Sequence, residues 1–275
     1  MIVDAHQHFW TLSRGDYAWP DETVPAIRRD FGPADLWRLA DAAGVDRTVL
    51  VQATDSVAET TFLLDVAARE PRVAGVVGWI DMAAPDAVAT FDRMRADPLL
   101  VGLRPMLQGI AETDWVLRDA VRPALDALEG SGLCFDALVQ PRHLGAIDTL
   151  AARHPSLPIV LDHGAKPQPG GHASWAEGMR RLAGRPNVTC KLSGLVTEIG
   201  PDWTVEGLRP YADTLLEAFG PERVMFGSDW PVVNLAADYG AWFDAAQALT
   251  AHLDAGARAA IFGGTACRVY GIGGT

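Results

Sequence analysis

The chain has 275 residues, of which 49% are hydrophobic and 21% are charged, and its formal net charge is −12. This composition is typical of a globular protein with a large core, and it excludes a disordered chain. The acidic balance argues against nucleic acid and an anionic membrane surface as partners, and it favours a small molecule. The sequence gives no indication of the oligomeric state.

No targeting or membrane segment is visible in the sequence. The stretch from Met1 to Phe9 lacks a basic region followed by an apolar one, and no run of about 18 apolar residues occurs. We therefore expect the protein to reside in the cytoplasm. The cysteines, Cys134, Cys190 and Cys267, are far apart and odd in number, so we expect buried core residues and neither a disulfide framework nor a CxxC zinc site.

Short apolar segments alternate with segments of helical period along the chain. The apolar segments are residues 2–9, 47–54, 73–80, 100–107, 133–140, 158–164, 188–195 and 223–231. Helices are expected from Pro33 to a stop at Gly44, and over residues 60–70, 119–128, 144–153 and 208–219. Strands that are apolar on both faces and are followed by helices are typical of parallel sheets. The pattern predicts a single (β/α)8 TIM barrel domain over residues 1–275.

Two connecting segments lack a clear period. Residues 10–32 contain several aromatic residues, and residues 165–174 are rich in proline and glycine. Both follow predicted strands, and the active site of a barrel lies at the C-terminal ends of its strands. We therefore expect both loops on the catalytic face.

His6 and His8 stand at the end of the first predicted strand. Their i, i+2 spacing directs both imidazoles to one face of a strand, where they could share a metal ion, a water molecule or a carbonyl oxygen. The alternative is a chance pair on a solvated strand face. Their position at the C-terminal end of a barrel strand favours a role in the site.

The next strands end in three further candidates. Gln52 offers a neutral hydrogen-bonding group, and Trp79 offers a flat apolar wall. The guanidinium of Arg104 suits a carboxylate or a row of sugar hydroxyls. Alternatively, Arg104 forms a salt bridge to a neighbouring loop.

The last three strands add His163, Lys191 and Asp229. The ammonium of Lys191 either faces the site as an electrophile or extends to water. Asp229 ends an otherwise apolar strand, where an isolated buried carboxylate is costly unless it is paired, bound to metal or needed for function. The alternative is a helix N-cap. Since the eighth strand neighbours the first, we expect Asp229 near His6 and His8.

Four motifs, DAHQHFW, LDHGAKP, CKLSGL and MFGSDWPV, together resemble the amidohydrolase superfamily. Within it they resemble the sugar-lactonase branch, which includes L-fuconolactonase, L-rhamnonolactonase and 2-pyrone-4,6-dicarboxylate lactonase. The resemblance covers nearly the whole chain and implies a barrel that hydrolyses a cyclic ester with His6, His8, His163 and Asp229. Binuclear relatives carry a lysine or glutamate on strand four and a histidine on strand five. Here those strands offer Arg104 on strand four and Asp136 and Gln140 on strand five, which argues against a two-metal centre.

As a mechanism, we expect Asp229 to accept a proton from water while His6, His8 and His163 stabilise the oxyanion as hydrogen-bond donors. The resemblance to the dicarboxylate lactonase implies that no cofactor is required. Alternatively, His6, His8 and Asp229 hold a single divalent metal such as zinc.

Further residues are candidates for contact with the substrate. The candidates for its hydroxyls or carbonyl are Arg104, Lys191, Gln52 and Gln108, and the candidate stacking walls are Trp10, Trp19, Trp79 and Trp230, each of which could instead pack the barrel. A single strand-end arginine favours a neutral sugar lactone over a dicarboxylate. The alternatives are zinc-dependent decarboxylation of a small carboxylic acid and a binding protein built on a degenerate barrel.

Overall fold

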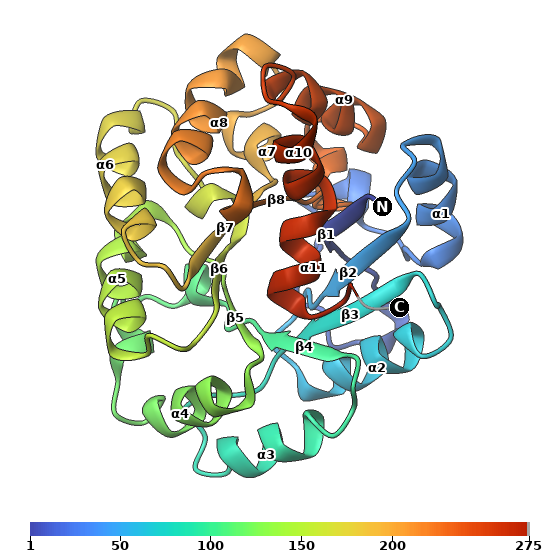
Figure 1. Cartoon of the computed structure of the whole chain (residues 1–275). Coiled ribbons are helices and arrows are strands. Elements are labelled where there is room, and N and C mark those ends of the chain that lie inside the picture. Colours follow the sequence, from blue (N-terminus) through green and yellow to red (C-terminus); the bar gives the residue numbers. More distant parts are fainter. Residues whose placement is uncertain (274–275) are drawn as a thin grey trace.

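Eight parallel strands form the centre of the protein in the computed structural model, which describes residues 1–273 (Figure 1). The strands are β1 (Val3–Gln7), β2 (Arg47–Val51), β3 (Val73–Gly78), β4 (Leu100–Leu103), β5 (Cys134–Ala137), β6 (Ile159–Leu161), β7 (Val188–Leu192) and β8 (Val224–Phe226). They pair in chain order. The sheet closes between β8 and β1, where the backbone nitrogen of His8 donates to the carbonyl oxygen of Trp230 at 2.7 Å. The predicted (β/α)8 barrel is confirmed.

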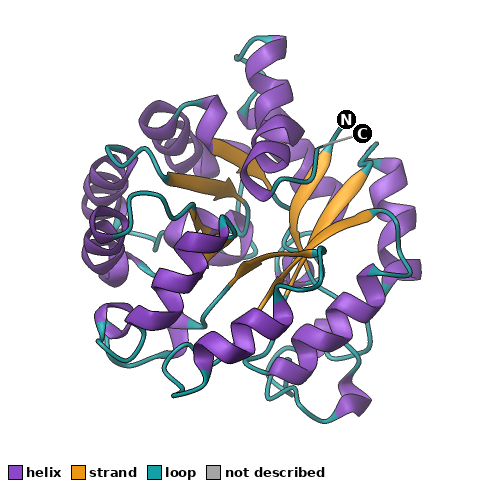
Figure 2. Cartoon of the chain, turned by 60° about the horizontal axis from the view of Figure 1, so that its bottom comes forward, coloured by secondary structure: helices purple, strands orange, loops and turns teal. Residues whose placement is uncertain are grey.

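Helices surround the strands, as Figure 2 shows. They are α1 (Pro33–Ala42), α2 (Val57–Ala67), α3 (Ala87–Met94), α4 (Arg122–Ser131), α5 (Leu144–Arg153), α6 (His172–Ala183), α7 (Leu195–Ile199), α8 (Val205–Phe219), α9 (Tyr239–Leu249), α10 (Ala255–Ala259) and α11 (Thr265–Tyr270). Among residues 1–273, none of these helices combines the length and apolar character needed to cross a bilayer.

The predicted helix boundaries were wrong where a capping residue was overlooked. Helix α2 begins three residues before the predicted start because the side chain of Ser56 accepts a hydrogen bond from the backbone nitrogen of Glu59. Helix α4 continues through Gly130, and the residue with left-handed backbone at its end is Gly132, with φ 75°. Helix α6 begins at His172, so the end of the predicted loop 165–174 is helical.

The N-terminal end of the barrel interior is apolar and is covered by the C-terminal helix. Val3, Val49 and Met225 from the strands pack with Tyr270 in one cluster. Figure 1 shows α11, which carries Tyr270, lying over the barrel. The interior polar groups therefore lie further along the strands, towards their C-terminal ends. Of the cysteines, Cys134 and Cys190 are buried as predicted, whereas Cys267 is only half-buried.

Candidate active site

A cavity of about 250 Å³ opens at the C-terminal ends of the strands. Its lining residues come from the loops that follow different strands, which is where barrel enzymes place their active sites. They are His8, Trp19, Ala53, Arg104, Met106, Gln108, Leu138, His163, Lys166, Asp229 and Val232. A largely apolar lining with a few convergent polar groups is typical of a small-molecule site.

A register shift in β1 accompanies the direction of His6, and of His8 just after the strand, into the site. The pairing of β1 with β2 shifts between Asp4 and Gln7, and such irregularities re-aim side chains. Ala5 packs inside the barrel, and His6, directly after it, also faces the interior. Nε2 of His8 lies 3.2 Å from Nε2 of His6. The two imidazoles therefore meet, as their spacing suggested.

His8 presents a nitrogen lone pair to the cavity. Its Nδ1 lies 2.8 Å from the carbonyl oxygen of Val51. Because a carbonyl only accepts, Nδ1 carries the proton of the neutral ring and Nε2 carries none. This Nε2 lies 3.3 Å from Oδ1 of Asp229, so two acceptors face each other. A cation or an additional proton between them would offset this repulsion.

His163 and Asp229 both have left-handed backbone conformations, with φ of 53° and 58°. Such conformations are uncommon outside glycine and cluster at functional sites. Gly194 leaves room for His163, since a Cβ there would lie 2.6 Å from Nδ1 of the ring. That nitrogen is 2.9 Å from Oγ of Ser193, and Nε2 is 3.8 Å from Oδ1 of Asp229. His163 therefore points at the same carboxylate oxygen as His8.

The carboxylate and the imidazoles differ in charge at neutral pH. Burial alone would raise the pKa of Asp229, but interactions with His163, His8 and His6 outweigh it and hold that pKa well below its usual value. Burial lowers the pKa of His163 to about 4 and that of His6 well below its usual value. The site thus combines an ionised carboxylate with neutral rings of His6 and His163.

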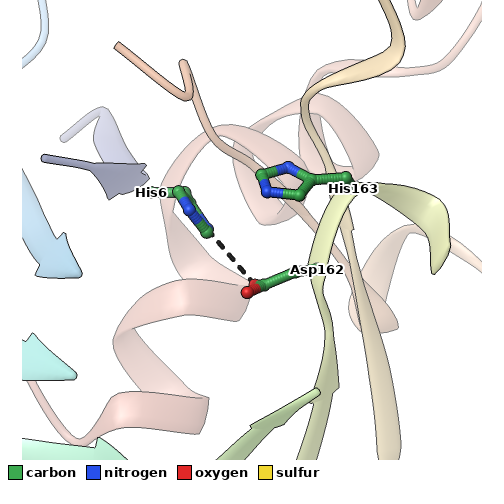
Figure 3. Close-up of side chains that lie close together, drawn as sticks. All are labelled: His6, Asp162 and His163. Atoms are coloured by element: carbon green, nitrogen blue, oxygen red, sulfur yellow. Dashed lines mark ion pairs between the residues drawn. The ribbon is translucent and has the colours of Figure 1, made fainter. Parts of the chain in front are cut away.

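A layer of buried ion pairs adjoins the imidazoles. Asp162 pairs with Arg104 at 3.0 Å and with Lys191 at 2.9 Å, and Lys191 also pairs with Asp136 at 2.6 Å. Figure 3 shows Asp162 directed at the ring of His6, whose Nδ1 lies 3.2 Å from Oδ1 of Asp162. All of these side chains are buried. The layer therefore lies beside the imidazoles inside the barrel, and Asp162 contacts the ring of His6.

Sequence reasoning missed Asp162. Burial raises the pKa of this carboxyl group, but Lys191, His6 and Arg104 outweigh the effect and hold it well below its usual value. Two cationic side chains, Lys191 and Arg104, and the imidazole of His6 thus contact the carboxylate of Asp162. The available signal was its position directly before His163 at the end of a predicted strand.

Three of the predicted substrate contacts, Arg104, Gln108 and Trp19, line the cavity. Lys166, which the sequence analysis also missed, lines it as well and pairs with Glu198 at 2.8 Å. Its signal was the LDHGAKP motif itself, in which a lysine follows the strand-end histidine. These side chains are the polar and aromatic groups of the cavity lining outside the cluster of His8, His163 and Asp229.

The structure places Lys191 and Gln52, two predicted substrate contacts, outside the cavity lining. Both are fully buried, and neither lines the cavity. Lys191 forms ion pairs with Asp136 and Asp162. Nε2 of Gln52 donates to the carbonyl oxygen of Arg104 at 2.8 Å, and the guanidinium of Arg104 donates to the carbonyl oxygen of Gln52. These contacts connect the ends of different strands.

Three of the predicted aromatic walls also lie outside the cavity. Trp10 is buried, and its Nε1 donates to the carbonyl oxygen of Arg29 at 2.7 Å. Trp230 is buried against Phe31, with 5.2 Å between the ring centroids. Trp79 lines a separate surface depression. Trp10 and Trp230 therefore pack the loops and the barrel, which was the alternative reading of these side chains.

The donor set of His6, His8 and Asp229 fits a divalent metal ion. One ligand atom from each lies within 4.8 Å of the others, and all three residues are buried. The lone pair on Nε2 of His8 and the ionised oxygen of Asp229 are the atoms that zinc prefers in mixed nitrogen and oxygen sites. A structure of a relative described below contains zinc.

Comparisons with known proteins agree with the barrel fold. A sequence profile of the family described as Amidohydrolase matches residues 3–272. The L-fucono-1,5-lactonase of Burkholderia ambifaria is 47% identical over 98% of this chain and 95% of its own length. A protein of the same name from Burkholderia multivorans is 38% identical over 98% of this chain and 96% of its own. A crystal structure of an amidohydrolase from Burkholderia multivorans with bound zinc has a TM-score of 0.93 and 36% identity, covering 99% of this chain and 100% of that one.

Proposed function

Because the chain belongs to the amidohydrolase family, we propose that it opens the ring of a sugar lactone by hydrolysis, with L-fucono-1,5-lactone as the candidate substrate. Two proteins named L-fucono-1,5-lactonase, at 47% and 38% identity, support this substrate class. The observation that carries the proposal is the carboxylate of Asp229 at the cavity. Its Oδ1 lies 3.3 Å from His8, 3.7 Å from His6 and 3.8 Å from His163.

Asp229 acts as the general base. It removes a proton from the attacking water as the water oxygen adds to the carbonyl carbon of the lactone. The bond between this carbon and the ring oxygen then breaks, the ring oxygen takes up the proton, and the product is a hydroxy acid. The low pKa of Asp229 keeps the carboxylate ionised and ready to accept the proton.

His163, which lines the cavity, and His6, which is buried and does not line it, are the imidazoles whose neutral rings could donate to the oxyanion. Nδ1 of each faces a group that can donate to it, Lys191 for His6 and Ser193 for His163, which leaves Nε2 free to carry the proton. The neutral ring of His8 cannot donate through Nε2, because its proton is on Nδ1. The expected three-donor arrangement is thus narrowed to two donors.

A divalent cation would be held by His6, His8 and Asp229. When bound, it would polarise the lactone carbonyl as a Lewis acid. A structure of a relative at 36% identity contains bound zinc, which supports a divalent cation as the group, and the ligand set is proposed from the donor atoms of this chain. The expectation that no cofactor is required stays a prediction, and removal of metal from the purified protein tests it.

A neutral lactone fits the charges of the cavity better than a dicarboxylate does. Arg104 and Lys166 are the cationic side chains that line it. Arg104 is paired with Asp162, and Lys166 is paired with Glu198. With both cations occupied, the remaining polar group of Gln108 suits a hydroxyl, and the apolar side chains suit the carbon face of a sugar.

A panel of substrates tests the proposal. Purified protein is offered L-fucono-1,5-lactone, other 1,4- and 1,5-aldonolactones, a pyrone dicarboxylate and an aromatic acid, and a pH indicator or carbon dioxide release reports the reaction. We expect acid release from aldonolactones above the spontaneous rate. Preference for the pyrone dicarboxylate would overturn the neutral-lactone assignment, and decarboxylation alone would overturn the hydrolase. Parallel reactions with a chelator show whether a metal is needed.

A further inference from the structure

Nδ1 of His6 has two buried neighbours of opposite hydrogen-bonding character. Nζ of Lys191 lies 3.1 Å away and can only donate. Oδ1 of Asp162 lies 3.2 Å away and can only accept. None of these three side chains is exposed. As the ring stands, Nδ1 has hydrogen-bond geometry to Lys191, whereas Oδ1 of Asp162 has no hydrogen-bond partner among residues 1–273. Nδ1 can accept from Lys191 or, after a small reorientation of the ring, donate to Asp162, and the two choices place the ring proton on different nitrogens.

In the first arrangement Nδ1 accepts, and the proton of the neutral ring is on Nε2. The ammonium of Lys191 donates to Asp136 at 2.6 Å and to His6 at 3.1 Å, and it also forms an ion pair with Asp162 at 2.9 Å. Nε2 of His6 can donate across 3.2 Å to Nε2 of His8, which carries a lone pair. In this arrangement both nitrogens of the His6 ring therefore have a hydrogen-bond partner.

In the second arrangement Nδ1 donates to Asp162, and Nε2 of His6 carries a lone pair. This nitrogen then faces the lone pair of His8 at 3.2 Å and the carboxylate of Asp229 at 3.7 Å. One N–H of Arg104, whose Nη1 lies 3.3 Å away, can approach it. Three acceptors that converge in this way form a ligand set for a cation. The lone pair of His8 therefore favours the first arrangement, with the proton of His6 on Nε2. Arg104 and a bound cation favour the second arrangement, with the proton on Nδ1.

We propose that Lys191 and Asp162 select the tautomer of His6, so that His6 carries its proton on Nε2 without a cation and on Nδ1 with one. On cation binding, Nε2 releases its proton to the water of the cavity, and Nδ1 takes up a proton from solvent. The ring is neutral before and after, and no other reactant is consumed. The inference rests on the cation site of the proposed function and does not depend on which lactone is hydrolysed. Lys191 and Asp162 are thus positioning residues that act through His6.

Nuclear magnetic resonance of the full chain with nitrogen-15-labelled histidine tests the proposal. Long-range nitrogen–proton correlations show which ring nitrogen carries a proton, and the spectrum of His6→Asn identifies the signals of His6. In metal-free protein we expect the proton on Nε2. After addition of zinc alone we expect it on Nδ1, with Nε2 shifted by the metal.

Removal of Lys191, which donates to Nδ1 of His6, should leave His6 with its proton on Nδ1. In Lys191→Met, Nδ1 retains only Asp162, so we expect the proton on Nδ1 even without zinc. Since this change leaves two carboxylates with one fewer cation, Lys191→Met with Asp136→Asn is the second variant, because it keeps the charges balanced. Lys166→Met, which removes a lysine that lines the cavity, is the matched control and should leave the signals of His6 unchanged.

Three results would overturn the inference. They are a proton on Nδ1 in metal-free wild-type protein, a proton that stays on Nε2 after zinc is added, and a proton that stays on Nε2 in a folded Lys191 variant without metal. A purely structural role for Lys191 would change stability and leave the tautomer as it was. None of these readouts uses a lactone, so a failure of the lactonase assignment is recognised separately in the substrate panel.

Discussion

The barrel interior contains two polar layers that balance their charges differently. The inner layer combines two cations, Arg104 and Lys191, with two carboxylates, Asp136 and Asp162. Its ion pairs are 2.6 to 3.0 Å long, and no member is more than 3% exposed. Each charge has an opposite charge in contact, which is the condition under which burial of ions is tolerated.

The outer layer consists of His6, His8, His163 and Asp229 and lacks such a balance. It has one carboxylate and no permanently charged cation of its own. Nε2 of each imidazole points at the same oxygen of Asp229, at 3.3 to 3.8 Å. The cavity opens onto three members of this layer, His8, His163 and Asp229, whereas His6 and Lys191 are buried and do not line it. The charges of the inner layer are therefore paired with one another without a ligand. The outer layer, in contrast, has hydrogen-bond acceptors that face one another and could bind a ligand.

The largest effect on stability should come from breaking the inner layer. Lys191→Met leaves Asp136 and Asp162 with too little positive charge in a buried setting. We expect the free energy of unfolding to fall by about 3–5 kcal/mol, as measured by urea denaturation. The double variant with Asp136→Asn should recover part of the loss. An unchanged unfolding free energy in Lys191→Met would contradict the structural role of this layer.

Asp4 shows what a buried carboxylate does without a cation. It is fully buried, accepts hydrogen bonds from the backbone nitrogens of Ser228 and His6 and from the hydroxyl of Tyr239, and forms no ion pair within residues 1–273. Burial raises its pKa to about 6. Between the unfolded value and this one, the folded state binds a proton that the unfolded state does not, so stability falls as pH rises from about 4 to about 6.

The pKa of Asp4 is about two units higher in the folded protein than in the unfolded chain, which corresponds to a loss of about 3 kcal/mol in the free energy of unfolding as the pH rises. Unfolding of wild-type protein and of Asp4→Asn, followed across this pH range, measures it. We expect the stability difference between the two proteins to shift in favour of Asp4→Asn as the pH increases. A difference that does not change with pH would mean that Asp4 ionises as easily in the folded protein as in the unfolded chain.

Gly194→Ala should disturb the outer layer alone. The added Cβ would lie 2.6 Å from Nδ1 of His163, and the ring must move. We expect a loss of about 10²-fold in kcat, since a displacement of about 1 Å at a reacting group has this effect. Gly132→Ala is the matched control, because it has a similar positive φ of 75° with nothing within 4 Å. Both variants should lose about 1–2 kcal/mol of stability, and equal activities would contradict the role of His163.

The sequence was sufficient to predict the barrel and the convergence of the outer layer. Eight apolar segments with helices between them leave few alternatives to a closed parallel sheet. A histidine pair on the first strand and an aspartate on the last must meet when the sheet closes, and His6, His8 and Asp229 do meet. This inference needs only strand order and the direction of the strands.

The inner layer could not be predicted in the same way. A strand end followed by a polar residue does not show how deep that residue lies, so Lys191 and Gln52 were expected at the substrate, whereas in the structure they are buried and do not line the cavity. The partner of Lys191 directly after β6, Asp162, is 29 positions away in the chain and was passed over in favour of its neighbour His163. Depth inside a barrel depends on strand register and on register shifts such as the one in β1, which composition does not encode.

Ring opening of L-fucono-1,5-lactone by wild-type protein and by Asp229→Asn, with the unfolding free energy of both, tests the central claim most directly. The variant keeps the shape of the side chain and removes the base. We expect kcat to fall by about 10³-fold while cooperative unfolding shows that the variant remains folded. Turnover by Asp229→Asn close to the wild-type rate would contradict the assignment of the outer layer as the catalytic site.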